Sequence, residues 1–201
     1  AASGSMLATI VVRDQPASEE NVGLRVWNGS DRVAAVLSQK LAQGSVGRKV
    51  FFASFADGNT LVIERLVALK DITVESLRQG YLHIVNEKFA CAGEDGRARR
   101  TLYYPGGEKT FFGFPSKDPA DDVVLPLDHP AWVNIDDKLS LHFRGTGATR
   151  YTNRHYFKVW HAVADDLELS VLEAPRAFAK DEPVGELATL ICPGQKHEEI
   201  S

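Results

Sequence analysis

The stretch Lys49-Val-Phe-Phe-Ala-Ser-Phe-Ala-Asp57-Gly58-Asn59-Thr-Leu-Val-Ile-Glu-Arg-Leu-Val-Ala-Leu69 decides the fold class of this chain. Two runs rich in Val, Ile and Phe flank an Asp-Gly-Asn turn, which accommodates the positive φ of a β-hairpin. A second turn signal, Glu94-Asp95-Gly96, lies between the β-rich runs 81–85 and 100–104. Short turns take the place of a strand–helix–strand rhythm, so the sequence predicts a sandwich or a barrel.

Strand candidates continue along most of the chain, and they are too many for a minimal seven-stranded sandwich. The sequence therefore predicts an all-β fold, a large two-sheet antiparallel β-sandwich with at most one short helix. The further strand candidates are residues 7–13, 21–27, 72–77, 81–89, 100–104, 109–114, 123–127, 131–135, 139–143, 156–161, 167–172 and 184–192. The residues expected in the core are Phe51, Leu61, Ile63, Leu82, Ile84, Leu102, Val133, Leu141, Phe157, Val159 and Leu169.

Residues 30–43 are the one ambiguous stretch. Apolar residues fall at helical spacing at Val33, Val36, Leu37 and Leu41. Asp31 could cap the start of a helix. Residues 33–37 could equally form a buried strand, so a short helix and a strand are both open here.

Composition limits the class of protein. The 201 residues are 44% hydrophobic and 25% charged, which suits one domain that needs no metal or disulfide for stability. The formal net charge of −4 argues against a nucleic-acid partner. No apolar run reaches the roughly 20 residues of a membrane span, and no signal-peptide pattern is present.

The chain is expected to form one domain. Residues 1–5 are typical of a cloning remnant, and residues 6–201 contain no internal boundary. Because the sequence stops just after a strand-like run, we expect a domain excised from a longer polypeptide. Cys91 and Cys192 are interpreted as small buried hydrophobes, with a disulfide as the alternative.

The densest cluster of polar and aromatic residues spans residues 150–161. Strand alternation places Arg154, Tyr156, Lys158 and Trp160 on one face, where cations and rings suit a sugar that carries carboxylate or sulfate groups. A solvated strand face is the alternative. Trp132, after a His-Pro pair, either presents its ring at a loop edge or fills the core. The residues predicted to bind a ligand are Arg150, Arg154, Tyr156, Lys158, Trp160 and Trp132.

No catalytic residue is assigned from the sequence. It contains no nucleophile elbow, phosphate-binding loop or zinc-protease motif. Asp136-Asp137 could hold calcium or act as an acid/base pair, but the pair is more typical of a turn. His155 and His161 share a strand face without a third ligand nearby, so we expect neither a catalytic metal nor a cofactor.

Several segments together resemble a known family. Residues 50–69, 81–86 and 100–103, the later Trp132-Val-Asn-Ile-Asp-Asp-Lys-Leu139 and the terminal Cys192-Pro-Gly-Gln-Lys-His-Glu-Glu199 are similar to the β-sandwich ("supersandwich") domains of bacterial polysaccharide lyases and glycoside hydrolases. In such lyases the main catalytic residues lie in a separate helical domain. The resemblance therefore implies a non-catalytic accessory domain whose partners are the catalytic domain of the same polypeptide and an anionic polysaccharide.

This resemblance leads to one interpretation and two alternatives. The interpretation is an accessory domain that packs on the catalytic domain and lines a polysaccharide cleft, in a secreted or periplasmic enzyme. The alternatives are a free-standing carbohydrate-binding module and a structural or assembly domain without a sugar ligand.

Overall fold

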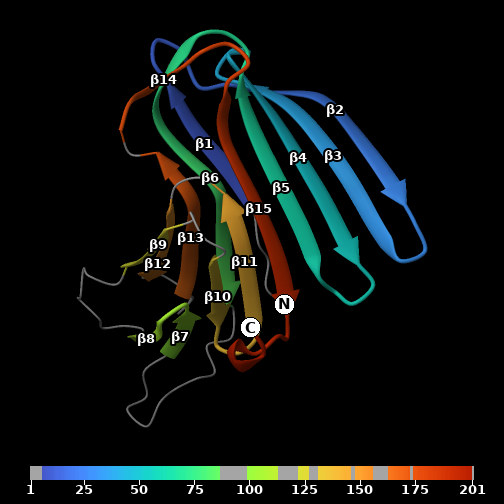
Figure 1. Cartoon of the computed structure of the whole chain (residues 1–201), viewed down its shortest axis with the longest axis vertical. Coiled ribbons are helices and arrows are strands. Elements are labelled where there is room, and N and C mark those ends of the chain that lie inside the picture. The colour runs from blue at the N-terminus through green and yellow to red at the C-terminus, as the bar shows by residue number, and fades with distance from the viewer. Residues whose placement is uncertain are drawn as a thin grey trace.

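The computed structural model describes residues 6–86, 99–112, 122–126, 131–145, 148–155, 163–172 and 174–200. Strands dominate these segments (Figure 1). They are β1 (Met6–Val12), β2 (Glu19–Asn28), β3 (Arg32–Leu41), β4 (Val46–Phe55), β5 (Thr60–Ala68), β6 (Ile72–Asn86), β7 (Arg99–Tyr104), β8 (Gly107–Phe112), β9 (Asp122–Pro126), β10 (Ala131–Ile135), β11 (Leu139–Gly145), β12 (Ala148–His155), β13 (Val163–Leu172), β14 (Arg176–Phe178) and β15 (Pro183–Pro193).

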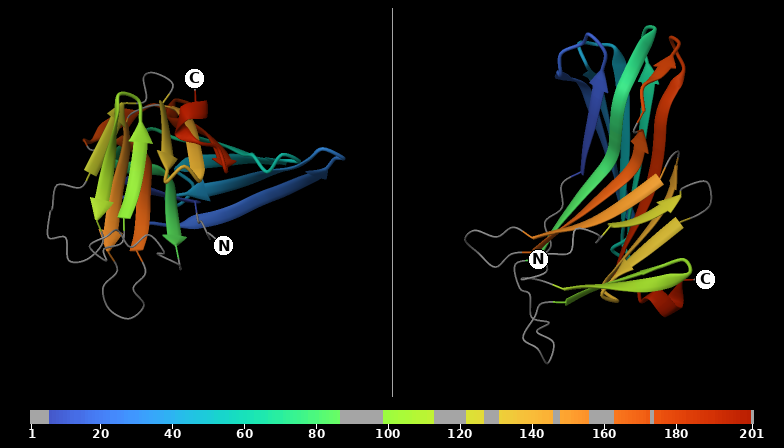
Figure 2. Two further views of the ribbon diagram at one scale, coloured as in Figure 1. Left: turned by 90° about the horizontal axis from the view of Figure 1, so that it is seen from below. Right: turned by 90° about the vertical axis from the view of Figure 1, so that its left-hand side faces the viewer.

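The strands form two antiparallel sheets. The large sheet has nine strands in the order β2-β3-β4-β5-β15-β11-β10-β7-β8. The small sheet has the order β1-β6-β13-β12-β9, with β14 paired to β6. In Figure 2 (left), β2 and β3 reach away from the rest of the molecule. The predicted all-β, two-sheet antiparallel sandwich is confirmed.

The ambiguous stretch 30–43 forms strand β3, and the helical alternative is wrong. β3 lies between β2 and β4 and pairs with both along its length, so both sides of its backbone are satisfied by neighbouring strands. This pairing outweighs the helical spacing of its apolar residues. Among the described residues, the one helical segment is a 3-10 turn at His197–Glu199, and no helix is long and apolar enough to cross a membrane.

The core has two parts. One lies between the sheets and includes Leu41, Val46, Leu66, Val74 and Phe178. The other lies under β7, β10, β11 and β15, and it consists of Leu102, Ala131, Val133, Ile135, Leu141, Phe143 and Leu187. Cys192 is a buried free thiol, and burial raises its pKa, as expected for a cysteine that packs as a small hydrophobe.

The core prediction is confirmed for Leu102, Val133 and Leu141, each 0% exposed. It is wrong for β4 and β5. Phe51, Leu61 and Ile63 are only half-buried, whereas β5 buries Val62, Glu64, Leu66 and Ala68. Both faces of these strands are apolar, and Glu64 stands in the buried set, so alternation gave no clear choice of face. Phe157 and Val159 lie outside the described residues, as do the side-chain surroundings of Leu82, Ile84 and Leu169.

A polar chain crosses the large sheet inside the sandwich. Arg48 Nε lies 2.5 Å from Glu64 Oε1, and Arg48 Nη1 donates to Gln39 Oε1 at 2.8 Å. Gln39 Nε2 in turn donates to Glu19 Oε1 and, at 2.8 Å, to Asn21 Oδ1. Each charge that the sandwich buries here therefore has a partner, as buried ionic groups require.

The inner face of the large sheet, which carries these residues, continues past the small sheet. Residues opposite each other in a ladder share a face, so the row Val62, Phe52, Ala35, Val26 runs from the core toward β2. Val62 is 2% exposed, whereas Phe52 is 41% and Val26 is 55% exposed, and Ala35 between them is half-buried. We call the exposed end of this face the inner apolar patch. Its residues are Leu24, Val26, Val33, Ala35, Leu37, Val50 and Phe52.

Candidate functional site

The site is built on the β10–β11 hairpin, whose outer face points away from the small sheet. Trp132 pairs with His142 and Asn134 with Ser140 across the hairpin. Asp136 and Asp137 both have φ of 53°, a conformation that Asp tolerates in a tight turn. The turn interpretation of this Asp-Asp pair is confirmed. Among the described residues, no group of three or more His, Cys, Asp or Glu side chains could hold a metal ion.

The segment after β15 folds over this hairpin. Gly194 N donates to Lys138 O at 2.7 Å, and Asn134 Nδ2 donates to the backbone oxygen of Gln195 at 2.8 Å. The side chain of Gln195 meets His142, with Oε1 2.9 Å from Nε2. The two segments that carry the family resemblance at the end of the chain therefore pack directly on each other.

His197 contacts both Tyr103 and Asp137 where the segment after β15 meets the β10–β11 turn. The rings of Tyr103 and His197 stack with centroids 3.8 Å apart and planes 2° from parallel. The backbone N–H of His197 donates to Asp137 Oδ1 at 2.9 Å. This backbone hydrogen bond, with the side-chain contact to the same ring, lowers the pKa of Asp137. Burial, reinforced by the charge of Asp137, raises the pKa of Tyr103. Asp137 is thus held as a carboxylate and Tyr103 as a phenol.

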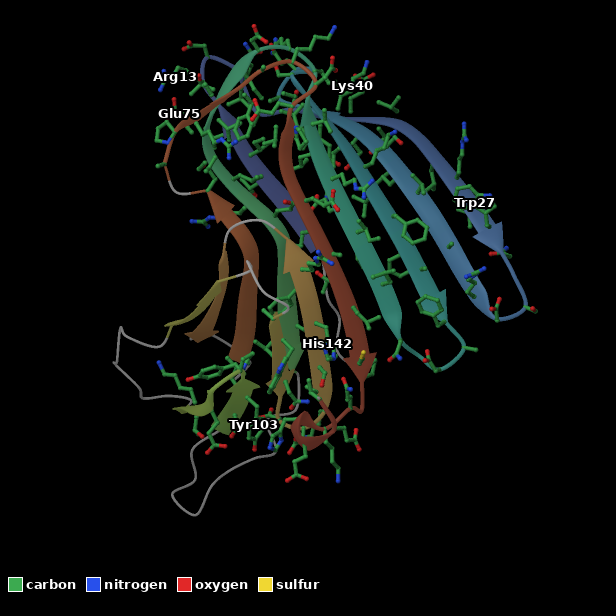
Figure 3. All side chains as sticks on the ribbon, viewed as in Figure 1. Arg13, Trp27, Lys40, Glu75, Tyr103 and His142 are labelled. Carbon is green, nitrogen blue, oxygen red and sulfur yellow. The ribbon has the colours of Figure 1, made fainter. Side chains whose placement is uncertain are left out.

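Beside this contact lies a hollow of about 460 Å³ on the outer face. Its lining includes the polar or aromatic side chains of Trp132, His142 and Arg144. Leu61, Leu190 and Ile200 supply apolar surface. Trp132 and His142 are half-buried and Arg144 is exposed. Figure 3 shows His142 on β11, far from Trp27 on β2. An indole beside a cation and a fixed imidazole can hold a flat ligand that is apolar on one side and polar on its edge.

Of the predicted ligand-binding residues that the structure describes, Trp132 alone lies at this hollow. Arg150 and Arg154 lie on β12 in the small sheet, opposite Glu168 and Ala164 of β13. They therefore belong to a different sheet from Trp132. Tyr156, Lys158 and Trp160 lie outside the described residues.

Two lining residues, His142 and Arg144, were missed by the sequence analysis. The signal was present, because Ser140, His142 and Arg144 alternate with apolar residues along β11. Strict alternation of this kind places the polar side chains on one face of a half-buried strand.

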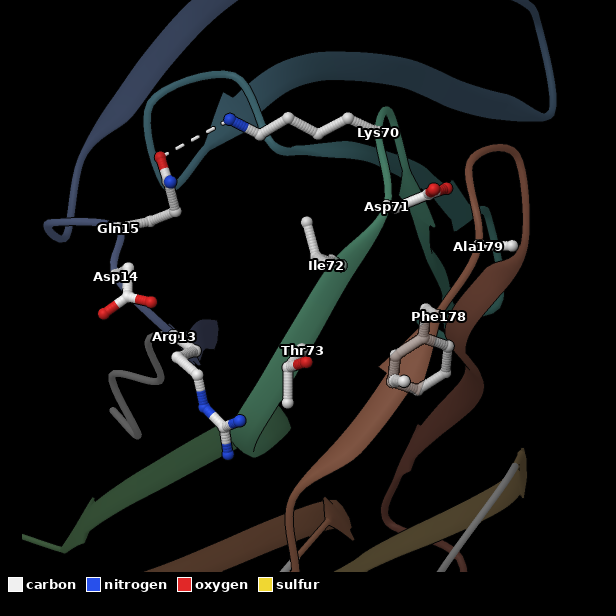
Figure 4. A pocket seen from close by; sticks show the side chains of 10 residues that line it. Arg13, Asp14, Gln15, Lys70, Asp71, Ile72, Thr73, Phe178 and Ala179 are labelled. Atoms are coloured by element: carbon white, nitrogen blue, oxygen red, sulfur yellow. Dashed lines mark hydrogen bonds between the residues drawn. The ribbon is translucent and has the colours of Figure 1, made fainter.

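A second hollow, of about 580 Å³, lies at the other end of the sandwich (Figure 4). Four of its polar side chains, those of Arg13, Gln15, Lys70 and Asp71, interact with groups of the chain itself. Arg13 Nε lies 2.5 Å from Glu75 Oε1, and Lys70 Nζ lies 3.5 Å from Gln15 Oε1. Asp71 Oδ1 accepts the backbone N–H of Lys180 at 2.8 Å. Internal pairing makes this hollow a weaker candidate than the one at Trp132.

Comparison with known proteins places the fold. No family model and no curated protein matches this sequence. Many solved structures are similar to this chain, among them the following three. The galactosidase domain of alpha-galactosidase-sucrose kinase AgaSK is 8% identical over 89% of this chain and 28% of its own, with a TM-score of 0.52. The GH36 alpha-galactosidase AgaB from Geobacillus stearothermophilus is 6% identical, with 90% and 28% covered and a TM-score of 0.53. The galactose 1-epimerase from Lactobacillus acidophilus NCFM is 10% identical, with 86% and 66% covered and a TM-score of 0.51.

The class that these likenesses define is a fold class, a two-sheet β-sandwich that also occurs in α-galactosidases and a galactose epimerase. The chain spans 28% of the length of the two galactosidase chains and 66% of the epimerase. The glycoside-hydrolase side of the expected resemblance is supported at the level of fold. Its polysaccharide-lyase side stays a prediction.

Proposed function

We propose that this chain is an accessory β-sandwich domain of a carbohydrate-active enzyme. It packs its inner apolar patch on the catalytic domain of the same polypeptide and turns its outer face toward a polysaccharide cleft. The observation that carries this proposal is that Phe52 and Val26 are exposed on the same apolar row of the large sheet as the buried Val62. The two sheets leave this apolar row uncovered, so we expect another protein surface to cover it.

The energetics favour a covered patch. Leaving Leu24, Val26, Val33 and Phe52 in water forgoes about 25 cal/mol for every Å² of apolar surface that a partner could bury. Contiguous apolar surface of this kind marks interaction sites in soluble proteins. The α-galactosidase chains that share this fold devote 28% of their length to it, which is consistent with a sandwich joined to a larger body.

Hydrogen exchange provides the test. The backbone amides of β2, β3 and β4 are compared in the isolated chain and in the complete polypeptide that its gene encodes. We expect slower exchange of β2–β4 in the complete polypeptide, with the β10–β11 hairpin as an internal reference. Equal exchange of β2–β4 in both, or a gene that encodes no catalytic domain, would contradict the accessory role and favour a free-standing module or an assembly domain.

A pair of variants sharpens the test. Val26 and Trp27 are adjacent on β2 and similarly exposed, at 55% and 51%, but their side chains lie on opposite faces of the sheet. Val26→Ser should restore fast exchange of β2–β4 in the complete polypeptide. Trp27→Ser should leave the slow exchange unchanged.

A further inference from the structure

We infer that the hollow at Trp132, His142 and Arg144 is a binding site for one ring of an acidic saccharide, a hexuronate residue. The inference stands on the outer face and is independent of what covers the inner apolar patch. It assigns a role to two residues, His142 and Arg144, that the sequence analysis did not connect with a ligand.

Trp132 supplies the flat surface. It lies on β10, which pairs with β11 along its whole length, and its neighbours Ala131 and Val133 are buried. A half-buried indole on a rigid strand presents a ring face at little entropic cost. The C–H face of a pyranose matches such a surface, and Leu61, Leu190 and Ile200 extend its apolar area.

His142 supplies an oriented polar edge. Gln195 Oε1 lies 2.9 Å from His142 Nε2, and an amide oxygen can only accept, so Nε2 carries the hydrogen. The imidazole is therefore fixed in one tautomer, and Nδ1 of the neutral ring remains an acceptor. Gln195 is held through its backbone oxygen by Asn134, so the polar edge belongs to a connected network.

Arg144 gives the preference for an acid. Arg48, Arg65 and Arg176 each form an ion pair with a glutamate, at 2.5, 2.9 and 3.2 Å. No described residue forms such a pair with Arg144, which lies exposed at the edge of the hollow. A guanidinium beside an indole forms a bidentate contact with a carboxylate that a neutral sugar lacks.

Calorimetry on the isolated chain tests this site with a galacturonate trisaccharide and the neutral galactose trisaccharide of the same linkage. We expect tighter binding of the acidic sugar, and this preference should shrink as salt is added. Trp132→Ala should weaken binding of both sugars about tenfold or more. Arg144→Gln should weaken only the acidic sugar, by about tenfold, and remove its salt dependence.

Trp27→Ala is the matched control, because Trp27 is an exposed tryptophan remote from the hollow (Figure 3). The Trp27→Ala variant should bind both sugars as the unmodified chain does. Circular dichroism verifies that every variant is folded. The inference is overturned if neither sugar binds at about 10 mM, if acidic and neutral sugars bind equally, or if Trp132→Ala and Arg144→Gln bind as the unmodified chain does. None of these outcomes bears on the exchange of β2–β4, so this site and the accessory role can fail separately.

Discussion

Asp137 and His197, separated by 60 positions in the sequence, are joined by two contacts to one carboxylate oxygen. Asp137 Oδ1 accepts the backbone N–H of His197 at 2.9 Å and lies 2.6 Å from its Nδ1. The contact fixes the end of the chain against the β10–β11 turn, beside the proposed sugar site.

Asp137→Asn should therefore destabilise the chain, by about 1 kcal/mol, because a charge-assisted contact is lost at a site partly open to water. The pKa of Asp137 is lowered in the folded protein, so the carboxylate stabilises the fold above its unfolded pKa of about 3.9. That stabilisation is lost as the pH falls through the folded pKa. Urea unfolding at several pH values should show a difference between variant and parent at about pH 6 that shrinks as the pH falls below the unfolded pKa of about 3.9. A difference that grows on acidification would contradict this assignment.

The Arg48–Glu64 pair provides the second prediction. Glu64 is 2% exposed, so Glu64→Gln leaves the buried guanidinium without its counter-charge and should cost about 3–5 kcal/mol. The double variant Arg48→Met/Glu64→Met should recover most of that loss, because no buried charge remains. The exposed pair Arg65–Glu186 is the control, and Glu186→Gln there should cost less than about 1 kcal/mol. Equal losses at the buried and exposed pairs would refute the argument.

Core positions differ from the half-buried face in a measurable way. Leu141 is 0% exposed, and Leu141→Ala should lower the free energy of unfolding by about 2–5 kcal/mol. Leu61 lies on the outer face and is half-buried, so Leu61→Ala should cost clearly less. Chemical denaturation of both variants checks the face assignment of the large sheet, and a larger loss at Leu61 would reverse it.

Gly145 tests the close approach of β11 and β15. A Cβ atom there would lie 2.6 Å from the backbone oxygen of Glu186 and 3.1 Å from a methyl carbon of Leu187. Because backbone must shift, Gly145→Ala should cost about 1–3 kcal/mol. Gly23→Ala, where nothing lies within 4 Å, should leave stability unchanged or slightly raised. Thermal unfolding compares the two variants. Equal midpoints would contradict the close approach of β11 and β15 at Gly145.

Strand alternation predicted the buried face correctly where one face of a strand is polar. It failed where both faces are apolar, as in β4 and β5. The hairpin around Asp57 and the buried positions of β10 and β11 follow from turn chemistry and period-two patterning. Residues 30–43 carry apolar side chains at both helical and strand spacing, so only the neighbouring strands determine their structure. The site needed contacts between distant segments, such as Gln195 with His142, which no local pattern contains. Trp132 could be selected from the sequence as an aromatic residue at a loop edge. Arg144 becomes a candidate only when the structure places it at the same hollow as Trp132.

The polar chain through Gln39, Arg48 and Glu64 has a consequence for how the strands align. β4 and β5 are apolar on both faces, so a slip of one residue between them would cost little in hydrophobic burial. The same slip would turn Arg48 outward and Lys49 inward, so Glu64 and Gln39 would lose the guanidinium that joins them. The ionic residues thus favour one register of the central strands over the registers that differ from it by one residue.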